Sequence, residues 1–224
     1  GVRLGVTDPA SVGEAIAETV ATEGRLDCLV CNAGINVSAP AEELPLDRAQ
    51  SIVATNLWGV IHCVRAALPH LRETRGRIVV IGSLAGMVGP PGEAFYAASK
   101  HGLRGFLESL QYEVRPMGVR VTLVEPGFIR TDLAKGAEPD WPRMAQYDRL
   151  LARLSAHWRE AIAGGMPPAR VAARVAKLAE QASPPFRTRI GRDAVWVPRL
   201  EAALPTDAFF RVTAAKFGIG GGGA

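Results

Sequence analysis

The sequence is short of several features that would point to particular protein classes. Only three of its 224 residues are cysteine, so we expect reduced thiols rather than a disulfide framework. No uninterrupted apolar run approaches the roughly 18 residues of a membrane span. The N-terminus also has no basic region followed by an apolar core, which a signal peptide would need. These absences favour a cytoplasmic protein without a membrane span.

Charge is present but not concentrated in one place. The formal net charge is +4, with 11 basic and 13 acidic residues through Gly127 and 15 basic and 9 acidic residues after it. The later arginines are spaced through helical patterns rather than clustered with aromatic residues, which favours a solvated face and predicts no nucleic-acid partner. With 48% hydrophobic residues, the chain is typical of one globular domain covering residues 1–224.

Two glycine and cysteine patterns look functional but have simpler explanations. The ending "FGIGGGGA" satisfies G-x-G-x-x-G, yet the chain stops one residue later and no helix can follow, so we interpret 218–224 as a flexible tail. Cys28 and Cys31 form a C-x-x-C inside an apolar strand, which points them to opposite faces. We therefore expect core packing there and no metal site.

Strand-like and helix-like segments alternate along the chain. The runs "RLDCLVCNAG", "GRIVVIGS" and "GVRVTLVEPG" are typical of buried parallel strands, and helical periodicity follows from about Pro45 to Arg75 and from about Ala94 to Arg115. Asp8 and Pro9 start an earlier helix that Gly24 ends, and "VRL" is then a candidate for the tail of a preceding strand. The pattern predicts an α/β fold: a Rossmann-like, doubly wound parallel sheet with helices on both faces.

After Gly127 the alternation breaks for about forty residues. One helical stripe there contains Met144, Tyr147, Leu151, Leu154, Trp158 and Ile162. An amphipathic helix packed on the body and an apolar substrate lid both explain this stripe, and both can hold at once. We assign residues 1–131 to a cofactor and catalytic part and residues 132–200 to a lid and C-terminal part. A helix over about Pro168 to Gln181, a short last strand and a helical C-terminal region complete the prediction.

The stretch "YAASK" carries the clearest chemistry. On a helix, Tyr96 and Lys100 are four residues apart and share a face. An ammonium near a phenol favours the phenolate, so this spacing predicts a lowered tyrosine pKa and acid–base action near neutrality. By itself the pair is commonly only a surface contact.

Other polar residues fall where the predicted strands and helices would bring them near this pair. Ser83 and Asn32 follow neighbouring strands, and Thr131 follows the third one, at the carboxyl edge where open parallel sheets bind ligands. Asn56 interrupts an apolar helix face and needs partners there, either a local backbone bond or a polar network with water. Each has a simple explanation alone, but the set in this order points to one site.

This set of motifs resembles the short-chain dehydrogenase/reductase family. "CNAG" is similar to its N-N-A-G motif with Cys31 in the first position, "NLWG" to its helix asparagine motif, "GSLAG" to its serine strand end, "YAASK" to Y-x-x-x-K, and "PGFIRT" to P-G-x-x-x-T. The match runs from about residue 4 to residue 131. The C-terminal third is similar to branches that act on apolar alcohols and ketones.

The resemblance implies a role for each of these residues. Tyr96 would exchange a proton with the substrate oxygen, Lys100 would lower its pKa and hold the nicotinamide ribose, Ser83 would orient the oxygen, and Asn56 would hold a water. The cofactor, NAD or NADP, would contact the residues Asn32, Ala33, Gly34, Tyr96, Lys100, Pro126, Gly127, Ile129 and Thr131. The family also implies a homodimer or homotetramer formed through the two long helices.

The sequence departs from the family at its start. The first strand, the T-G-x-x-x-G-x-G loop and the second strand should precede "VRLGVTD", so we expect that roughly 50 or more further residues belong to the natural protein. Gly5 stands where the family usually has an Asp that contacts adenine.

Two other functions compete with an NAD(P)-dependent oxidoreductase of alcohols and ketones. A non-catalytic binding or scaffold protein could keep the fold after losing the cofactor loop. An epimerase or dehydratase of the extended branch shares Y-x-x-x-K but usually has a longer C-terminal part.

Overall fold

The computed structural model describes residues 1–131 and 141–219. Within these residues one parallel sheet has the strand order β1-β2-β3-β4. The strands are β1 (Cys28–Cys31), β2 (Arg77–Ile81), β3 (Arg120–Pro126) and β4 (Arg187–Ile190). All three pairings are parallel, so the carboxyl ends of the strands lie at one edge of the sheet. The three predicted apolar strands and the predicted last strand are confirmed.

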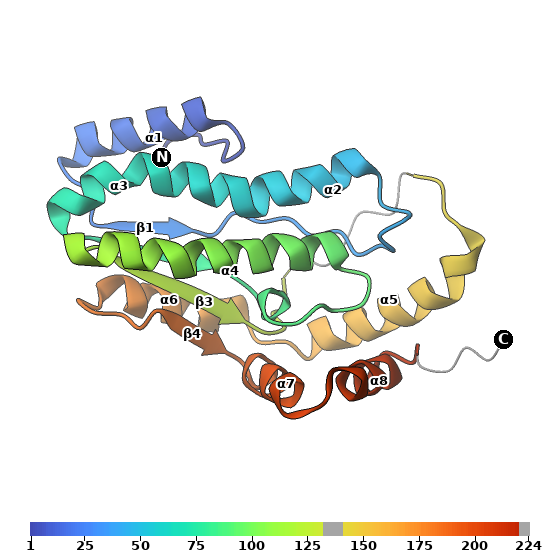
Figure 1. The fold of residues 1–224 in the computed structure, drawn as a ribbon. Coiled ribbons are helices and arrows are strands. Elements are labelled where there is room, and N and C mark those ends of the chain that lie inside the picture. The colour runs from blue at the N-terminus through green and yellow to red at the C-terminus, as the bar shows by residue number, and fades with distance from the viewer. Residues whose placement is uncertain (132–140, 220–224) are drawn as a thin grey trace.

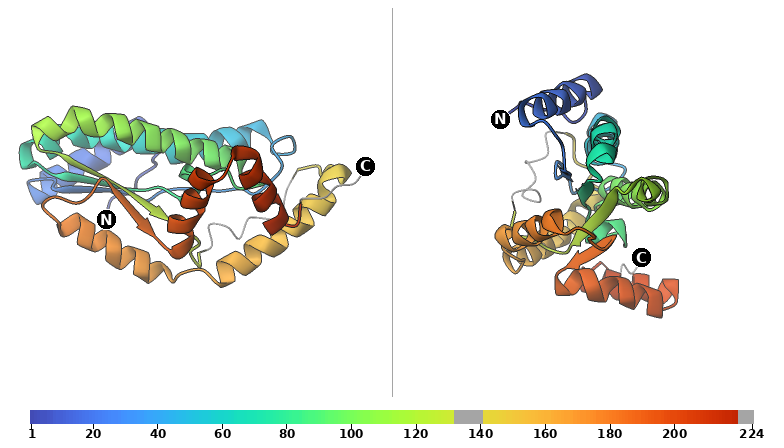
Figure 2. Two further views of the ribbon diagram at one scale, coloured as in Figure 1. Left: turned by 60° about the horizontal axis from the view of Figure 1, so that its bottom comes forward. Right: turned by 90° about the vertical axis from the view of Figure 1, so that its left-hand side faces the viewer.

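Helices cover both faces of this sheet (Figures 1 and 2). On one face, α3 (Gly59–Thr74) and α4 (Ala94–Val114) pack on the main core with side chains such as Val64, Leu71 and Leu103. On the other face, α6 (Pro168–Glu180) contributes Leu178, which packs against Val79 and Val124. The predicted doubly wound α/β fold is confirmed.

The first helix, α1 (Pro9–Glu23), begins and ends as predicted. The Asp8 carboxylate accepts a hydrogen bond from the Ala10 amide at 3.0 Å, and Gly24 ends the helix with a φ of 78°. α1 packs along α3 (Figure 1). The prediction that "VRL" is the end of a strand is wrong, because residues 1–5 form no strand pairing and the Gly5 amide instead bonds to the Ser11 hydroxyl.

The helix predicted from Pro45 to Arg75 contains a change of winding. It consists of α2 (Leu46–Val53), a π-helical segment η1 (Ala54–Trp58), and α3. Such wide turns inside helices are frequent at functional sites. Asn56, which sequence analysis singled out as a buried polar residue, lies in the middle of this segment.

The same stretch bears on the expected absence of a membrane span. Among the described residues, Leu46–Thr74 is long and apolar enough to cross a membrane by length and composition alone. Core helices of soluble proteins meet the same criterion, and 39% of this apolar window is buried inside the structure. The expectation rested on uninterrupted apolar runs, which polar residues such as Asn56 and His62 break here.

The C-terminal third of the described residues contains four α-helices. The last of them ends just before the segment 218–224, which was predicted to be a flexible tail. These helices are α5 (Asp148–Ala163), α6, α7 (Arg192–Ala203) and α8 (Thr206–Lys216). Gly218 is not part of a free tail: its φ is 67°, and the Ile219 amide donates back to the Ala214 carbonyl at 2.8 Å, which closes the end of α8. The rest of the predicted tail, 220–224, lies outside the described residues.

The cysteines lie in the core, as expected. Cys28 packs on the side of α6, and Cys31 lies on the opposite face of the sheet beside Cys63 of α3. All three thiols are free. The prediction that Cys28 and Cys31 point to opposite faces is confirmed.

Candidate active site

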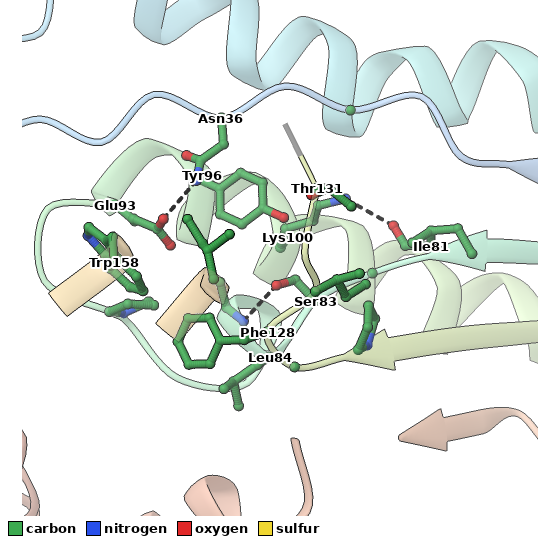
Figure 3. A pocket seen from close by; sticks show the side chains of 18 of the residues that line it. Asn36, Ile81, Ser83, Leu84, Glu93, Tyr96, Lys100, Phe128, Thr131 and Trp158 are labelled. Atoms are coloured by element: carbon green, nitrogen blue, oxygen red, sulfur yellow. Dashed lines mark hydrogen bonds between the residues drawn. The ribbon is translucent and has the colours of Figure 1, made fainter. Parts of the chain in front are cut away.

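A cavity of about 320 Å³ opens at the carboxyl edge of the sheet. Its walls come from the ends of β2 and β3, the segment after β1, the start of α4, and α5 (Figure 3). Nine of the predicted site residues line it: Asn32, Gly34, Ser83, Tyr96, Lys100, Pro126, Gly127, Ile129 and Thr131. The other two, Asn56 and Ala33, are not in its wall.

Tyr96 and Lys100 lie on the first turns of α4. This helix begins at Ala94, so the i, i+4 spacing puts both side chains on the face that meets the sheet edge. Lys100 Nζ lies 5.7 Å from the centre of the Tyr96 ring and donates a hydrogen bond to the Ile81 carbonyl at 2.9 Å. The strand end of β2 therefore holds the ammonium beside the phenol.

Burial decides how these two groups titrate. It raises the pKa of Tyr96 to about 12; a hydrogen bond with Ser83 acts in the opposite direction, and the nearby Glu93 adds to the rise. Burial also lowers the pKa of Lys100 to about 8. The expected lowering of the tyrosine pKa by Lys100 is therefore wrong for this structure. Removing the phenolate from water disfavours it more than the hydrogen bond with Ser83 stabilises it.

Ser83 follows β2 in an extended conformation and faces the same cavity. Its Oγ accepts a hydrogen bond from the Ala85 amide at 3.1 Å and so begins the short helical turn η2 (Leu84–Gly86). A hydroxyl that accepts one bond can still donate its own proton. The hydroxyls of Ser83 and Tyr96 lie on the same side of the cavity (Figure 3). The hydrogen bond between them favours the Tyr96 phenolate.

Asn56 supports the site from behind. Its side chain is fully buried and forms three hydrogen bonds: Oδ1 accepts from the Ile35 amide at 2.9 Å, and Nδ2 donates to the Ile35 carbonyl at 2.9 Å and to the Ser99 hydroxyl at 3.1 Å. The alternative of a local backbone bond is wrong, because the backbone partner Ile35 lies 21 residues away; the hydroxyl of Ser99 is the second partner. Asn56 holds the segment after β1 against α4.

Gly34 lies close to Asn56 and Lys100. A Cβ on this residue would lie 3.4 Å from Asn56 Oδ1 and 3.9 Å from Lys100 Nζ. Gly34 therefore lies beside the ammonium, and both residues line the cavity. Asn32 and Ala33 lie next to it and are exposed.

The end of β3 is positioned by a residue that the sequence analysis did not single out. Asp193, at the start of α7, accepts a hydrogen bond from the Phe128 amide at 2.6 Å, and its carboxylate occupies the space where a Cβ on Gly127 would lie. The Gly127 amide donates to the Ile190 carbonyl at 2.9 Å. The segment after β3, which contains predicted cofactor contacts such as Gly127 and Ile129, is thus held by the C-terminal part of the chain.

Helix α5 forms another wall of the cavity. Trp158 and Ile162 line it, whereas Leu151 and Leu154 are buried against the body of the protein. The interpretation of the stripe as a helix packed on the body is confirmed, and its interpretation as a cover for a substrate stays a prediction. Met144 and Tyr147 precede the buried part; residues 132–140 of the predicted lid lie outside the described residues.

Asn36 and Glu93 also line the cavity, and sequence analysis did not assign them a role. Asn36 Nδ2 donates to Glu93 Oε1 at 2.7 Å (Figure 3). A signal was present for Glu93: it is a lone charged residue in the otherwise uncharged stretch "MVGPPGEAF", three positions before Tyr96. No pattern connects it to Asn36. Among the described residues, no group of three or more His, Cys, Asp or Glu could hold a metal ion.

A family model described as short chain dehydrogenase matches residues 1–141. The chain is 32% identical to 3-ketodihydrosphingosine reductase of Bacteroides thetaiotaomicron over 190 residues, which is 83% of this chain and 70% of that protein.

Two solved structures have a similar fold. A short-chain dehydrogenase from Streptomyces avermitilis has a TM-score of 0.78 and is 29% identical, covering 97% of this chain and 77% of the other. A short-chain dehydrogenase/reductase from Burkholderia phymatum in complex with NAD has a TM-score of 0.76 and is 25% identical, covering 90% of this chain and 74% of the other.

Proposed function

The chain belongs to the short-chain dehydrogenase family, and we propose that it is an NAD(P)-dependent oxidoreductase that transfers a hydride between nicotinamide and an alcohol or ketone. The observation that carries this proposal is the position of Tyr96, Ser83 and Lys100 around one cavity at the carboxyl edge of the sheet. A non-catalytic binding protein would have no need to keep a phenol, a hydroxyl and an ammonium together there.

The residues present fit a nicotinamide nucleotide. Gly34 lies beside Lys100 in the cavity wall, and Ile129 and Thr131 line the same cavity. Asn32 and Gly34 would contact the nucleotide near the end of β1, with the exposed Ala33 beside them, and Pro126 and Gly127 would contact it at the end of β3. When bound, the nicotinamide supplies the hydride for ketone reduction or accepts it in alcohol oxidation. The choice between NAD and NADP is left open.

In ketone reduction, the carbonyl carbon gains a hydride and the carbonyl oxygen gains a proton. The Ser83 hydroxyl would hold this oxygen by a hydrogen bond while Tyr96 donates the proton. A pKa of about 12 keeps Tyr96 protonated at neutral pH, which suits the reductive direction. Lys100 would stabilise the phenolate that remains until solvent returns a proton, and Asn56 would keep the segment after β1 in place for this relay.

The substrate that fits this cavity is partly apolar. Leu84, Phe128 and Ile162 line it near the polar groups, and Trp158 closes it from α5. The name of the Bacteroides relative also specifies a keto group in its substrate. We propose a small alcohol or ketone with apolar carbon next to the reacting centre, in a cytoplasmic protein that forms a homodimer or homotetramer.

A nicotinamide oxidation assay tests the function. The protein is mixed with NADH or NADPH and a panel of apolar ketones, using this chain and a longer form that carries the N-terminal segment expected from the resemblance. Tyr96→Phe should lower kcat by at least about 100-fold, because it removes the proton donor. Tyr112→Phe, on the exposed side of the same helix, is the matched control and should keep full activity. Equal turnover by Tyr96→Phe would contradict the mechanism, and failure of both forms to bind either nucleotide would favour a scaffold protein.

A further inference from the structure

Beyond the Tyr96 ring, the cavity contains polar groups that proton transfer does not use. Asn36, Glu93 and Trp158 lie around this part of it (Figure 3). Glu93 and Trp158 are each only 8% exposed. Polar groups so deeply buried are normally paired, so their partners need an explanation.

Glu93 does not serve as a helix cap. It directly precedes α4, but its side chain makes no capping hydrogen bond, and Oε1 accepts instead from Asn36. No lysine or arginine within residues 1–131 and 141–219 forms an ion pair with it. Burial raises its pKa to about 7. A buried carboxylate without a cation is costly, and a protein keeps one mostly where it has a function.

Its neighbours are also incompletely paired. Asn36 Oδ1 is buried and has no hydrogen-bond partner among the described residues, and the same is true of Trp158 Nε1. Asn36 Oδ1 and the Glu93 carboxylate are both acceptors. A ligand with several N–H donors and a positive charge would pair with both of them, and a protonated amine meets this requirement.

We propose that Asn36 and Glu93 form a subsite for a protonated amine, so that the preferred substrate is a ketone or alcohol with an ammonium group near the reacting carbon. This inference rests on the proposed function. Glu93 directly precedes α4 and Tyr96 lies on its first turn, and both residues line the same cavity (Figure 3). One small molecule can therefore place its carbonyl oxygen at Tyr96 and an amine a few bonds away at Glu93.

A purely structural role for Glu93 makes a different prediction. If the Asn36–Glu93 hydrogen bond only joins the segment after β1 to α4, its loss would affect all substrates equally. Glu93→Gln separates the two roles, because a glutamine keeps the acceptor for Asn36 but removes the negative charge. Glu113→Gln removes the same charge from the exposed surface of the same helix and is the matched control.

The test uses an α-amino ketone and the same ketone with a methyl group in place of the ammonium, at pH 8. Dissociation constants are measured by calorimetry, and kcat/KM by nicotinamide oxidation. The unchanged protein and Glu113→Gln should prefer the amino ketone by on the order of 10- to 100-fold in both quantities. In Glu93→Gln both ratios should fall to near one. A preference that survives in Glu93→Gln, or an equal loss for both ketones, would overturn the subsite.

The two readouts separate this inference from the proposed function. Preferential binding of the amino ketone that depends on Glu93, without turnover, would support the subsite and contradict the oxidoreductase. Turnover of both ketones without preference would support the oxidoreductase and overturn the subsite. Absence of both binding and turnover would overturn both.

Discussion

Glu93 directly precedes α4, Tyr96 and Lys100 lie on its first turns, and each of the three is more than nine-tenths buried. Burial disfavours the charged form of each group, so it raises the pKa of Tyr96 and of Glu93 and lowers the pKa of Lys100. At neutral pH the phenol is protonated and the amine is mostly charged. Residues placed for chemistry in this way usually reduce the stability of the fold.

Glu93→Gln should stabilise the protein at alkaline pH and have little effect near pH 4.5. Between its ordinary pKa of 4.5 and its folded value of about 7, the unfolded chain loses this proton while the folded chain keeps it, so stability falls as pH rises through this range. At about 1.4 kcal/mol per pKa unit, the ionised Glu93 lowers the free energy of unfolding by about 3 kcal/mol above pH 7. Urea unfolding of both proteins at pH 5 and pH 8 measures this difference in free energy. Equal differences between the two proteins at both pH values would contradict the burial argument, and Glu113→Gln is the control.

Asn56→Ala should destabilise the protein by about 2–4 kcal/mol. The change removes a partner from the buried Ser99 hydroxyl and from the partly buried amide and carbonyl of Ile35. Denaturant unfolding should therefore show a lower midpoint. Gln50→Ala, at an exposed position of α2, should change the midpoint very little. A small effect for Asn56→Ala would mean that water replaces the lost bonds.

At the scale of elements, the site depends on how strands and helices end. β2 ends at Ile81, whose carbonyl accepts a hydrogen bond from Lys100, and Ser83 starts a helical turn two residues later. β3 ends in Pro126 and Gly127, where Asp193 from α7 holds the following segment. The ends that form the cavity are therefore joined to elements far along the chain, and a change in one of these contacts moves the cavity wall.

Gly127→Ala should damage the cavity without a change of charge. The new Cβ would overlap the Asp193 carboxylate, so the hydrogen bond from the Phe128 amide must lengthen or break. Overpacking of this kind costs about 1–3 kcal/mol in stability, and we expect a raised KM for the nucleotide because Pro126 and Ile129 shift with the segment. Gly164→Ala is the matched control, since its Cβ would make an ordinary contact at 3.5 Å. Unchanged stability and KM in Gly127→Ala would show that α7 moves aside freely.

At the scale of the whole molecule, one surface over α2, η1 and α4 remains apolar. Leu46 and Trp58 are exposed there, and Ala49, Val53 and Phe95 line a groove of about 360 Å³ beside them. Large exposed apolar patches mark interfaces. This surface is where the proposed homo-oligomer would form, because the resemblance implies association through these two long helices.

Trp58→Glu should therefore convert the oligomer to monomers. A charge in the middle of a buried apolar interface leaves an unpaired ion there, which such an interface does not tolerate. Light scattering coupled to size-exclusion chromatography measures the mass. Trp196→Glu changes an exposed tryptophan of α7 and should leave the mass unchanged. A monomeric mass for the unchanged protein would remove the proposal.

Local patterns in the sequence were enough to predict most elements. The helix starting at Pro9, the helix from Ala94 and the parallel strands follow from periodicity, caps and apolar runs, which involve residues close in sequence. The strand at 2–4 failed for a different reason: a strand needs a partner to accept its hydrogen bonds, and no local pattern reports whether one lies beside it.

For the site, the sequence by itself determined which chemical groups are present and which end of the sheet they occupy, because strand ends and the i, i+4 spacing are local properties. Only the tertiary structure decided how these groups titrate and what supports them. Asn36 meets Glu93 across 57 residues, and Phe128 meets Asp193 across 65. Burial, which raises the pKa of Tyr96 instead of lowering it, is likewise a property of the packed molecule, since it depends on side chains brought together from distant parts of the chain.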